Sequence, residues 1–168
     1  MRPFFAVARP VLIVLLAALL GACSAESQKS RSLEKAAEAY RSGDFERARI
    51  EYQNVLQKFP NDPVANERLA LIWYDRGAPV RSLAFFSRLN LQSPANQGLR
   101  VKRARLLLAL GRTAEARREA EGVLRTTTTV PEALALLPET IREREDFKAA
   151  DELLQNFAEK NSAWYQLA

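Results

Sequence analysis

The stretch RSGDFERARIEY, residues 41–52, decides the fold because the chain repeats it in altered form at a fixed distance. Its glycine, Gly43, returns as Gly77 and Gly111 at a constant step of 34 residues, and the next step reaches Glu145. At that fourth position Glu-Asp-Phe repeats the Gly-Asp-Phe of the first. A fixed period of this size predicts an array of stacked structural units.

Small and large residues follow each of these four positions at equal distances. Five residues on stand Ala48, Ser82, Ala116 and Ala150, and four further on stand Tyr52, Phe86, Ala120 and Leu154. The small side chain lets two helices approach closely, and the residue one helical turn later fills the space beside it. Pro60 and Pro94 come eight residues after Tyr52 and Phe86. Because proline cannot continue a helix, we expect the units to stop there.

This arrangement resembles the tetratricopeptide repeat family, whose units are helix-turn-helix hairpins. The resemblance implies an all-α fold, a right-handed α-solenoid of tetratricopeptide hairpins. Its units cover residues 29–62, 63–96 and 97–130, with a degenerate fourth unit from residue 131. Pro138 stands where the other units have Ala36, Ala70 and Ala104. We therefore expect the first helix of the fourth unit to be kinked or shortened.

Glycine, apolar spacing and branched residues mark the helices within the units. Gly43 ends the first helix of its unit, as do the glycines that repeat it. In the second unit Leu83, Phe86 and Leu89 recur at helical spacing and predict a second helix that includes all three. The β-branched run of residues 126–130 precedes a proline and favours an extended connection.

The first 22 residues have the layout of a secretory signal peptide. Two arginines precede an apolar run of ten residues, 11–20, and no acid occurs in the segment. Ten residues are short for a membrane span of about 20. The sequence Leu-Gly-Ala-Cys at 20–23 resembles a bacterial lipobox, which implies cleavage before Cys23 and a covalent lipid on its sulfur. The alternatives are an uncleaved span, or an ordinary signal with a chance cysteine.

The resemblance to bacterial lipoproteins also implies a location. Ser24 follows the cysteine, whereas aspartate there is the usual inner-membrane retention signal, so we expect the outer membrane, facing the periplasm. Residues 23–30 form the lipidated cysteine and a polar tether, expected to be flexible. Residues 31–168 form the tetratricopeptide domain of about four repeats. The segment from Trp164 fits the opening of a fifth repeat, which favours a truncated array; the alternative is a short capping helix.

The composition excludes several classes of function. The chain has no histidine and one cysteine, which removes the commonest general base, the commonest metal ligand and any intramolecular disulfide. Its six glycines are scattered and form no phosphate-binding loop. The neighbouring acids Glu143, Glu145 and Asp146 are interpreted as exposed acids at a helix end. We therefore expect no enzyme, no metal site and no cofactor apart from the lipid.

Basic residues are concentrated between Arg76 and Ala114, where no acid occurs. They are Arg76, Arg81, Arg88, Arg100, Lys102, Arg103, Arg105 and Arg112. Such a patch suits an acidic partner, an anionic glycan or phosphate-bearing lipid headgroups. The alternative is a solvated helix face. Nucleic acid is not expected as a partner of an exported protein.

Tetratricopeptide arrays generally bind partner proteins on a concave surface lined by the first helix of each unit. By that resemblance, one register of this surface holds Tyr40, Tyr74, Leu108 and Arg142, and another holds Ala37, Leu71, Arg105 and Glu139. We expect Tyr40, Tyr74, Arg105 and Leu108 to contact partners, because tyrosine combines apolar area with a hydroxyl group at low entropy cost. The alternative is that both tyrosines pack at the junctions between units.

The sequence therefore predicts a non-catalytic, membrane-anchored scaffold that binds partner proteins in a bacterial envelope assembly. Exopolysaccharide export is the first hypothesis for that assembly. A pilotin-like role in pilus secretin assembly and regulation of cell-wall synthesis stay open, because the fold alone does not choose among them. A hypothesis of another class is a binder of an anionic glycan or lipid through the arginine-rich surface.

Overall fold

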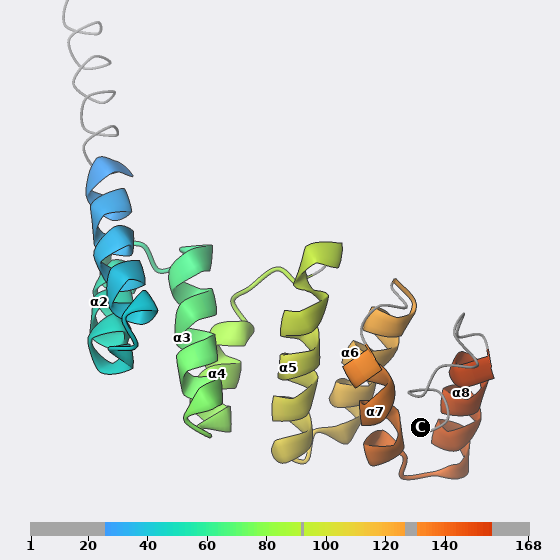
Figure 1. Ribbon diagram of the computed structural model, residues 1–168. Helices are drawn as coiled ribbons and strands as arrows, with labels where there is room; N and C mark the ends of the chain where they lie inside the picture. The colour runs from blue at the N-terminus through green and yellow to red at the C-terminus, as the bar shows by residue number, and fades with distance from the viewer. Residues whose placement is uncertain (1–25, 92, 127–130, 156–168) are drawn as a thin grey trace, which may run out of the picture. The chain divides into compact units, whose positions relative to one another are not determined.

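The computed structural model describes residues 26–91, 93–126 and 131–155. Throughout these ranges the chain forms helices joined by short turns, without strands, which confirms the predicted all-α class. The helices divide into two compact units, Met1–Ala65 and Asn66–Ala168. Figure 1 shows the successive helices of each unit.

The first unit contains a helix over residues 26–41, then α2 (Phe45–Lys58) and the first turn of α3 (Pro63–Asp75). Ala48 and Tyr52 are buried on α2, the first as the small contact residue and the second as the large residue one turn later. Asp44 begins α2, since its carboxylate accepts the Arg47 N–H at 3.0 Å. The pairing of small and large residues predicted from the repeat is therefore present in this hairpin.

Residues 26–30, predicted to belong to a flexible tether, are helical, so that prediction is wrong for them. The reason lies in Lys29, whose Nζ is 2.9 Å from a carboxylate oxygen of Glu26 and 3.8 Å from one of Asp62. The same ammonium lies 5.8 Å from the centre of the Phe59 ring. These contacts connect the start of the first helix with the segment that follows α2. The rest of the predicted tether lies outside the described residues.

Three glycines build the turns of the first three hairpins. Gly43, Gly77 and Gly111 have φ values of +80°, +65° and +73°. In each turn the glycine N–H donates to the carbonyl three residues back, and the next N–H to the carbonyl five residues back, at 2.8 to 3.2 Å. Glycine adopts this left-handed conformation with little strain, which explains why it ends the first helix of each of these units.

The fourth turn lacks the glycine and is built from side chains. It joins α7 (Pro131–Thr140) to α8 (Arg144–Gln155). The Asp146 carboxylate accepts the backbone N–H groups of Arg142 and Glu143 at 2.9 and 3.1 Å. Arg117 pairs with the same carboxylate and donates to the Thr140 carbonyl at 2.5 Å. The Arg117 hydrogen bond, with the two backbone donors, holds the pKa of Asp146 well below its usual range.

The predicted shortening of the fourth unit's first helix is confirmed. α7 has 10 residues, whereas α3 and α5 (Gln97–Ala109) have 13 each. Pro138 lies in its last turn, and the helix ends two residues later at Thr140. The predicted extended connection at residues 127–130 and the predicted fifth repeat from Trp164 lie outside the described residues.

The second helix of the second hairpin is shorter than the sequence predicts. α4 (Pro79–Phe86) ends before Leu89, so its predicted extension through Leu89 is wrong. The carbonyl of Ala84, which an α-helix would pair with the Arg88 N–H, accepts the Ser87 hydroxyl at 2.9 Å. The Arg88 and Leu89 N–H groups bond three residues back, at 3.1 Å each, and this tighter pattern ends the helix. The chain then reaches η1 (Pro94–Asn96) and α5.

Two apolar clusters hold the second unit together. Phe86 on α4 packs with Ala70 and Leu106, and the Ser82 hydroxyl donates to the Ala70 carbonyl at 2.7 Å. A larger cluster joins α5, α6 (Thr113–Leu124), α7 and α8 around Leu134 and Leu137, which are fully buried. In Figure 1, α6 lies beside both α5 and α7, with which it is in contact. α5 therefore has one side toward α6 and another toward α7.

Candidate functional site

An open groove with a volume of about 440 Å³ lies between α5 and α7. We call it the α5–α7 groove; its lining residues are Arg105, Leu108, Ala109, Ala135, Leu136, Glu139 and Arg142. Six of them come from α5 and α7, the first helices of the third and fourth hairpins, and Arg142 lies in the turn that follows α7. The resemblance assigned partner binding to the face formed by these helices.

The groove has an apolar floor and open sides. Leu136 is buried and Leu108 is partly buried against the core cluster, so both leucines are held in place by packing. Ala109 and Ala135 are exposed and short, which leaves space above the floor. A side chain of a partner could therefore enter between the two helices and contact the leucines.

The charged residues of the groove form few contacts with other described residues of the protein. Arg105 is exposed, and among the described residues it forms no ion pair, nor does Glu139. Within the described residues, the Arg142 guanidinium donates only to the adjacent Ile141 carbonyl, at 3.3 Å. Two guanidinium groups and one carboxylate thus line the groove, which gives it an excess positive charge.

The structure brings together two of the four predicted partner-binding residues, Arg105 and Leu108. Tyr74 lies on α3, partly buried in the cluster around Phe86, with the Lys102 Nζ 4.6 Å from its ring centre. Tyr40 belongs to the other compact unit, where its ring meets Phe45 edge-on at 5.3 Å and 76°. Both tyrosines thus make packing contacts, and a role for them in partner binding stays a prediction.

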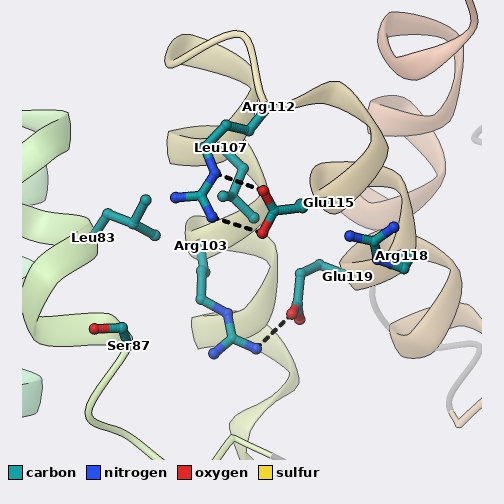
Figure 2. Close-up of a pocket in the computed structure, with 8 residues that line it drawn as sticks. All are labelled: Leu83, Ser87, Arg103, Leu107, Arg112, Glu115, Arg118 and Glu119. Carbon is teal, nitrogen blue, oxygen red and sulfur yellow. Dashed lines mark hydrogen bonds and ion pairs between the residues drawn. The ribbon is translucent and has the colours of Figure 1, made fainter.

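A second hollow of about 280 Å³ lies beside the α5–α6 hairpin and is shown in Figure 2. We call it the α4–α6 hollow; it is lined by Leu83, Ser87, Arg103, Leu107, Arg112, Glu115, Arg118 and Glu119. Leu83 of α4 and Ser87, which directly follows α4, form one wall, and the charged residues of the α5–α6 hairpin form the other. Sequence reasoning missed this site.

Two sets of ion pairs to acids of α6 organise the charged wall of the hollow. Arg112 holds Glu115 with two hydrogen bonds of 2.7 Å, which lower the pKa of Glu115 and raise that of Arg112. Glu119 receives Arg100 Nε at 3.0 Å and Arg103 Nη2 at 2.6 Å. Glu115 and Glu119 come just after the acid-free interval of residues 76–114 and are one helical turn apart. This spacing could have indicated the site in the sequence.

The arginine-rich segment is therefore not a uniform basic surface. Three of its eight basic residues, Arg100, Arg103 and Arg112, pair with acids of α6. Four others stack on aromatic rings: Arg76 and Arg81 on Trp73, Arg88 on Phe85 and Lys102 on Tyr74. Arg105 alone of the eight faces the α5–α7 groove.

The described ranges contain no group of three or more His, Cys, Asp or Glu side chains that could hold a metal ion. No helix in these ranges is both long and apolar enough to cross a membrane. Of the neighbouring acids, Asp146 is occupied by Arg117 and by the turn described above. Cys23, the predicted lipidation site, lies outside the described residues.

Comparison with known proteins agrees with the hairpin architecture. The family model of the tetratricopeptide repeat matches residues 33–96. No curated protein matches the chain. Tetratricopeptide repeats are typically non-catalytic modules of protein interaction. Residues 33–96 thus match the tetratricopeptide repeat, and this match supports the general role of a protein-interaction scaffold.

Proposed function

We propose that this protein is a lipid-anchored scaffold that holds partner proteins of a bacterial envelope assembly at the periplasmic face of the outer membrane. The lipobox-like residues 20–23 support the anchor at Cys23, and Ser24 supports the outer membrane. Several acyl chains on one residue would make the attachment lasting, because each buried methylene contributes about 0.8 kcal/mol.

The α5–α7 groove is the observation that carries the proposal. Arg105 and Glu139 are 34 residues apart, as are Leu108 and Arg142, and all four line one groove. Its leucine floor and excess positive charge suit a partner segment that carries an apolar residue next to a carboxylate. Among envelope assemblies, exopolysaccharide export is our first choice; pilus secretin assembly and cell-wall regulation are the alternatives.

Site-specific photocrosslinking in intact cells tests the groove. A photoreactive amino acid at Ala135, exposed in the groove, should crosslink one defined partner. The matched control is the same amino acid at Ala114, an exposed alanine on α6 that does not line the groove. Mass spectrometry of the crosslinked partner would identify the assembly as export, secretin or cell-wall machinery.

A groove variant makes the test specific. Leu108→Asp should abolish the Ala135 crosslink. The variant places a carboxylate on the apolar floor of the groove, where it would repel the carboxylate of the partner and lose the apolar contact. Circular dichroism would verify that the variant is folded. Equal crosslinking from Ala135 and Ala114, or a crosslink that survives Leu108→Asp in the folded protein, would exclude the groove as the binding site.

The anchor is tested separately by metabolic labelling with a fatty-acid analogue. The wild-type protein should take up the label and sediment with outer membranes, whereas Cys23→Ser should do neither. Because the groove lies far along the chain from this residue, the purified Cys23→Ser protein should still bind the partner. An unlabelled wild-type protein would remove the anchor and leave the scaffold proposal standing.

Binding of an anionic glycan or lipid is the second candidate function. Arg81 and Arg88 are exposed on α4 and its following turn, where they stack on Trp73 and Phe85. Neither arginine forms an ion pair with an acid among the described residues. Binding that falls steeply with added salt and survives Leu108→Asp would favour this function over the scaffold.

A further inference from the structure

We propose that the α4–α6 hollow binds a phosphate group. The hollow is separate from the α5–α7 groove, and the proposal rests on neither the partner protein nor the lipid anchor. A volume of about 280 Å³ admits a phosphate with a few bonded atoms. It is too small for a helix or a folded partner, so the ligand is a small group.

The charged wall of the hollow holds more positive than negative charge. Glu119 receives both Arg100 and Arg103, and the three side chains are only 19%, 9% and 16% exposed. One carboxylate neutralises one guanidinium, so this trio keeps one positive charge in a largely buried place. Because a buried charge without a counterion is unfavourable, an anion that enters beside Arg103 is stabilised.

The backbone of α6 leaves space for this excess charge. A Cβ atom added at Gly122 would lie 2.2 Å from Arg100 Nη2 and 3.1 Å from its Cζ. Glycine inside a helix is less favourable than alanine, and at this position its missing side chain is what admits the guanidinium. With its side chain in this space, Arg100 as a whole residue is only 7% exposed. The convergence of two arginines on Glu119 is thus built into the packing of α5 on α6.

Hydrogen-bond donors remain unused on the arginines that line the hollow. Arg112 uses Nε and Nη2 for Glu115, and Arg103 uses Nη2 for Glu119. A guanidinium has five N–H donors. Figure 2 shows the remaining terminal nitrogen of each arginine directed toward α4, across the hollow. In addition, Arg103 Nε is buried and has no hydrogen-bond partner among the described residues.

The arrangement of donors favours phosphate over carboxylate. A planar carboxylate is satisfied by one guanidinium fork, as Glu115 is by Arg112, whereas a tetrahedral phosphate offers oxygens in several directions. Arg103 on α5, Arg112 in the turn after α5 and the exposed Arg118 on α6 line the hollow from different positions. The phosphate belongs to a free phosphorylated molecule or to a lipid headgroup, two sources with the same chemistry.

Isothermal titration calorimetry of the purified protein with inorganic phosphate at low ionic strength tests the site. We expect a single-site isotherm. The double variant Arg112→Gln with Arg118→Gln should bind at least about tenfold more weakly, a loss of about 1.4 kcal/mol. Both side chains are exposed, so this variant should fold. Arg103→Lys, which keeps the charge and loses the fork, should also weaken binding.

The matched control is Arg125→Gln, which removes an exposed arginine of the segment just after α6 whose nearest acid is Glu121, outside the hollow. It should bind phosphate like the wild type. No binding by the folded wild-type protein would overturn the proposal, and so would equal weakening by Arg125→Gln, because the effect would then be nonspecific.

Vesicles distinguish the two sources of phosphate. Phosphatidic acid vesicles that bind the Cys23→Ser protein, and release it when inorganic phosphate is added, would assign the site to lipid headgroups. Vesicles that do not bind, together with a phosphate isotherm, would assign it to a free phosphorylated molecule. Vesicle binding that the Arg112→Gln, Arg118→Gln variant retains in full would place the lipid contact elsewhere and contradict a headgroup role for the hollow.

Discussion

Arg103 and Arg105 stand two residues apart on α5, yet their environments are opposite. Arg103 is 16% exposed and bonded to Glu119 of α6. Arg105 is exposed in the α5–α7 groove without an ion pair among the described residues. Two residues correspond to a rotation of about 200° around a helix, so the two side chains point to different neighbours. The position of an arginine around the helix, rather than its membership of a basic run, therefore decides which residues it contacts.

The two sides of α5 therefore have different tasks. On the side toward α6, Glu119 binds two arginines of α5 and so connects the two helices of one hairpin, while Glu115 binds Arg112 at the start of α6. On the side toward α7, the charged residues lie over an apolar floor and stay available. The first side contributes to folding and carries the proposed phosphate site, and the second is the proposed partner site.

A substitution in the core that supports both sides of α5 should cause the greatest loss of stability. Leu137 is fully buried in the core shared by α5, α6 and α7, so Leu137→Ala should reduce the free energy of unfolding by about 2–5 kcal/mol. Urea denaturation measures the loss, and both partner crosslinking and phosphate binding should weaken. Leu108→Ala, at a partly buried groove position, is the control and should cost less. If Leu137→Ala removed only partner crosslinking or only phosphate binding, the two sides of α5 would not depend on a common core.

Smaller losses of stability are expected from substitutions that test the different environments of Arg103 and Arg105. Glu119→Gln leaves two largely buried guanidinium groups without their carboxylate and should lower the free energy of unfolding by about 1–3 kcal/mol. Arg103→Gln should cost less, because Arg100 and Glu119 then remain as a one-to-one pair. Arg105→Gln should stay within about 0.5 kcal/mol, since it breaks no internal contact. Equal losses for Glu119→Gln and Arg105→Gln in urea denaturation would refute the division of tasks.

The smallest effect is a pH dependence at the fourth turn, where a further α6 arginine, Arg117, is paired. The pKa of Asp146 is lower in the folded than in the unfolded state because Arg117 and two backbone N–H groups stabilise the carboxylate. Its contribution is therefore present above the unfolded pKa of about 4 and is lost as the pH falls toward the folded value. Asp146→Asn should melt lower than the wild type at pH 7, with the difference shrinking below about pH 4. Thermal melts that stay separated at low pH would contradict this assignment.

Much of the fold could be predicted from the sequence because it depends on local backbone chemistry. The step of 34 residues, the left-handed glycines and the helix-shortening Pro138 act within a few residues of their own positions. The same period placed Arg105 and Leu108 on first helices in registers that share one groove. The burial of a small side chain and of a larger one a turn later could likewise be predicted from the sequence, as Ala48 and Tyr52 show.

The errors and omissions arose where distant residues meet. The helix at residues 26–30 is supported by Asp62 and Phe59, and the α4–α6 hollow exists because α6 brings two acids beside an interval that contains none. The hairpins and their turns follow from φ preferences and helical periodicity, which are local properties, so they could be predicted without the structure. Which arginines are paired and which are available depends on the packing of the helices, because charge pairing depends on distance in space and not along the chain.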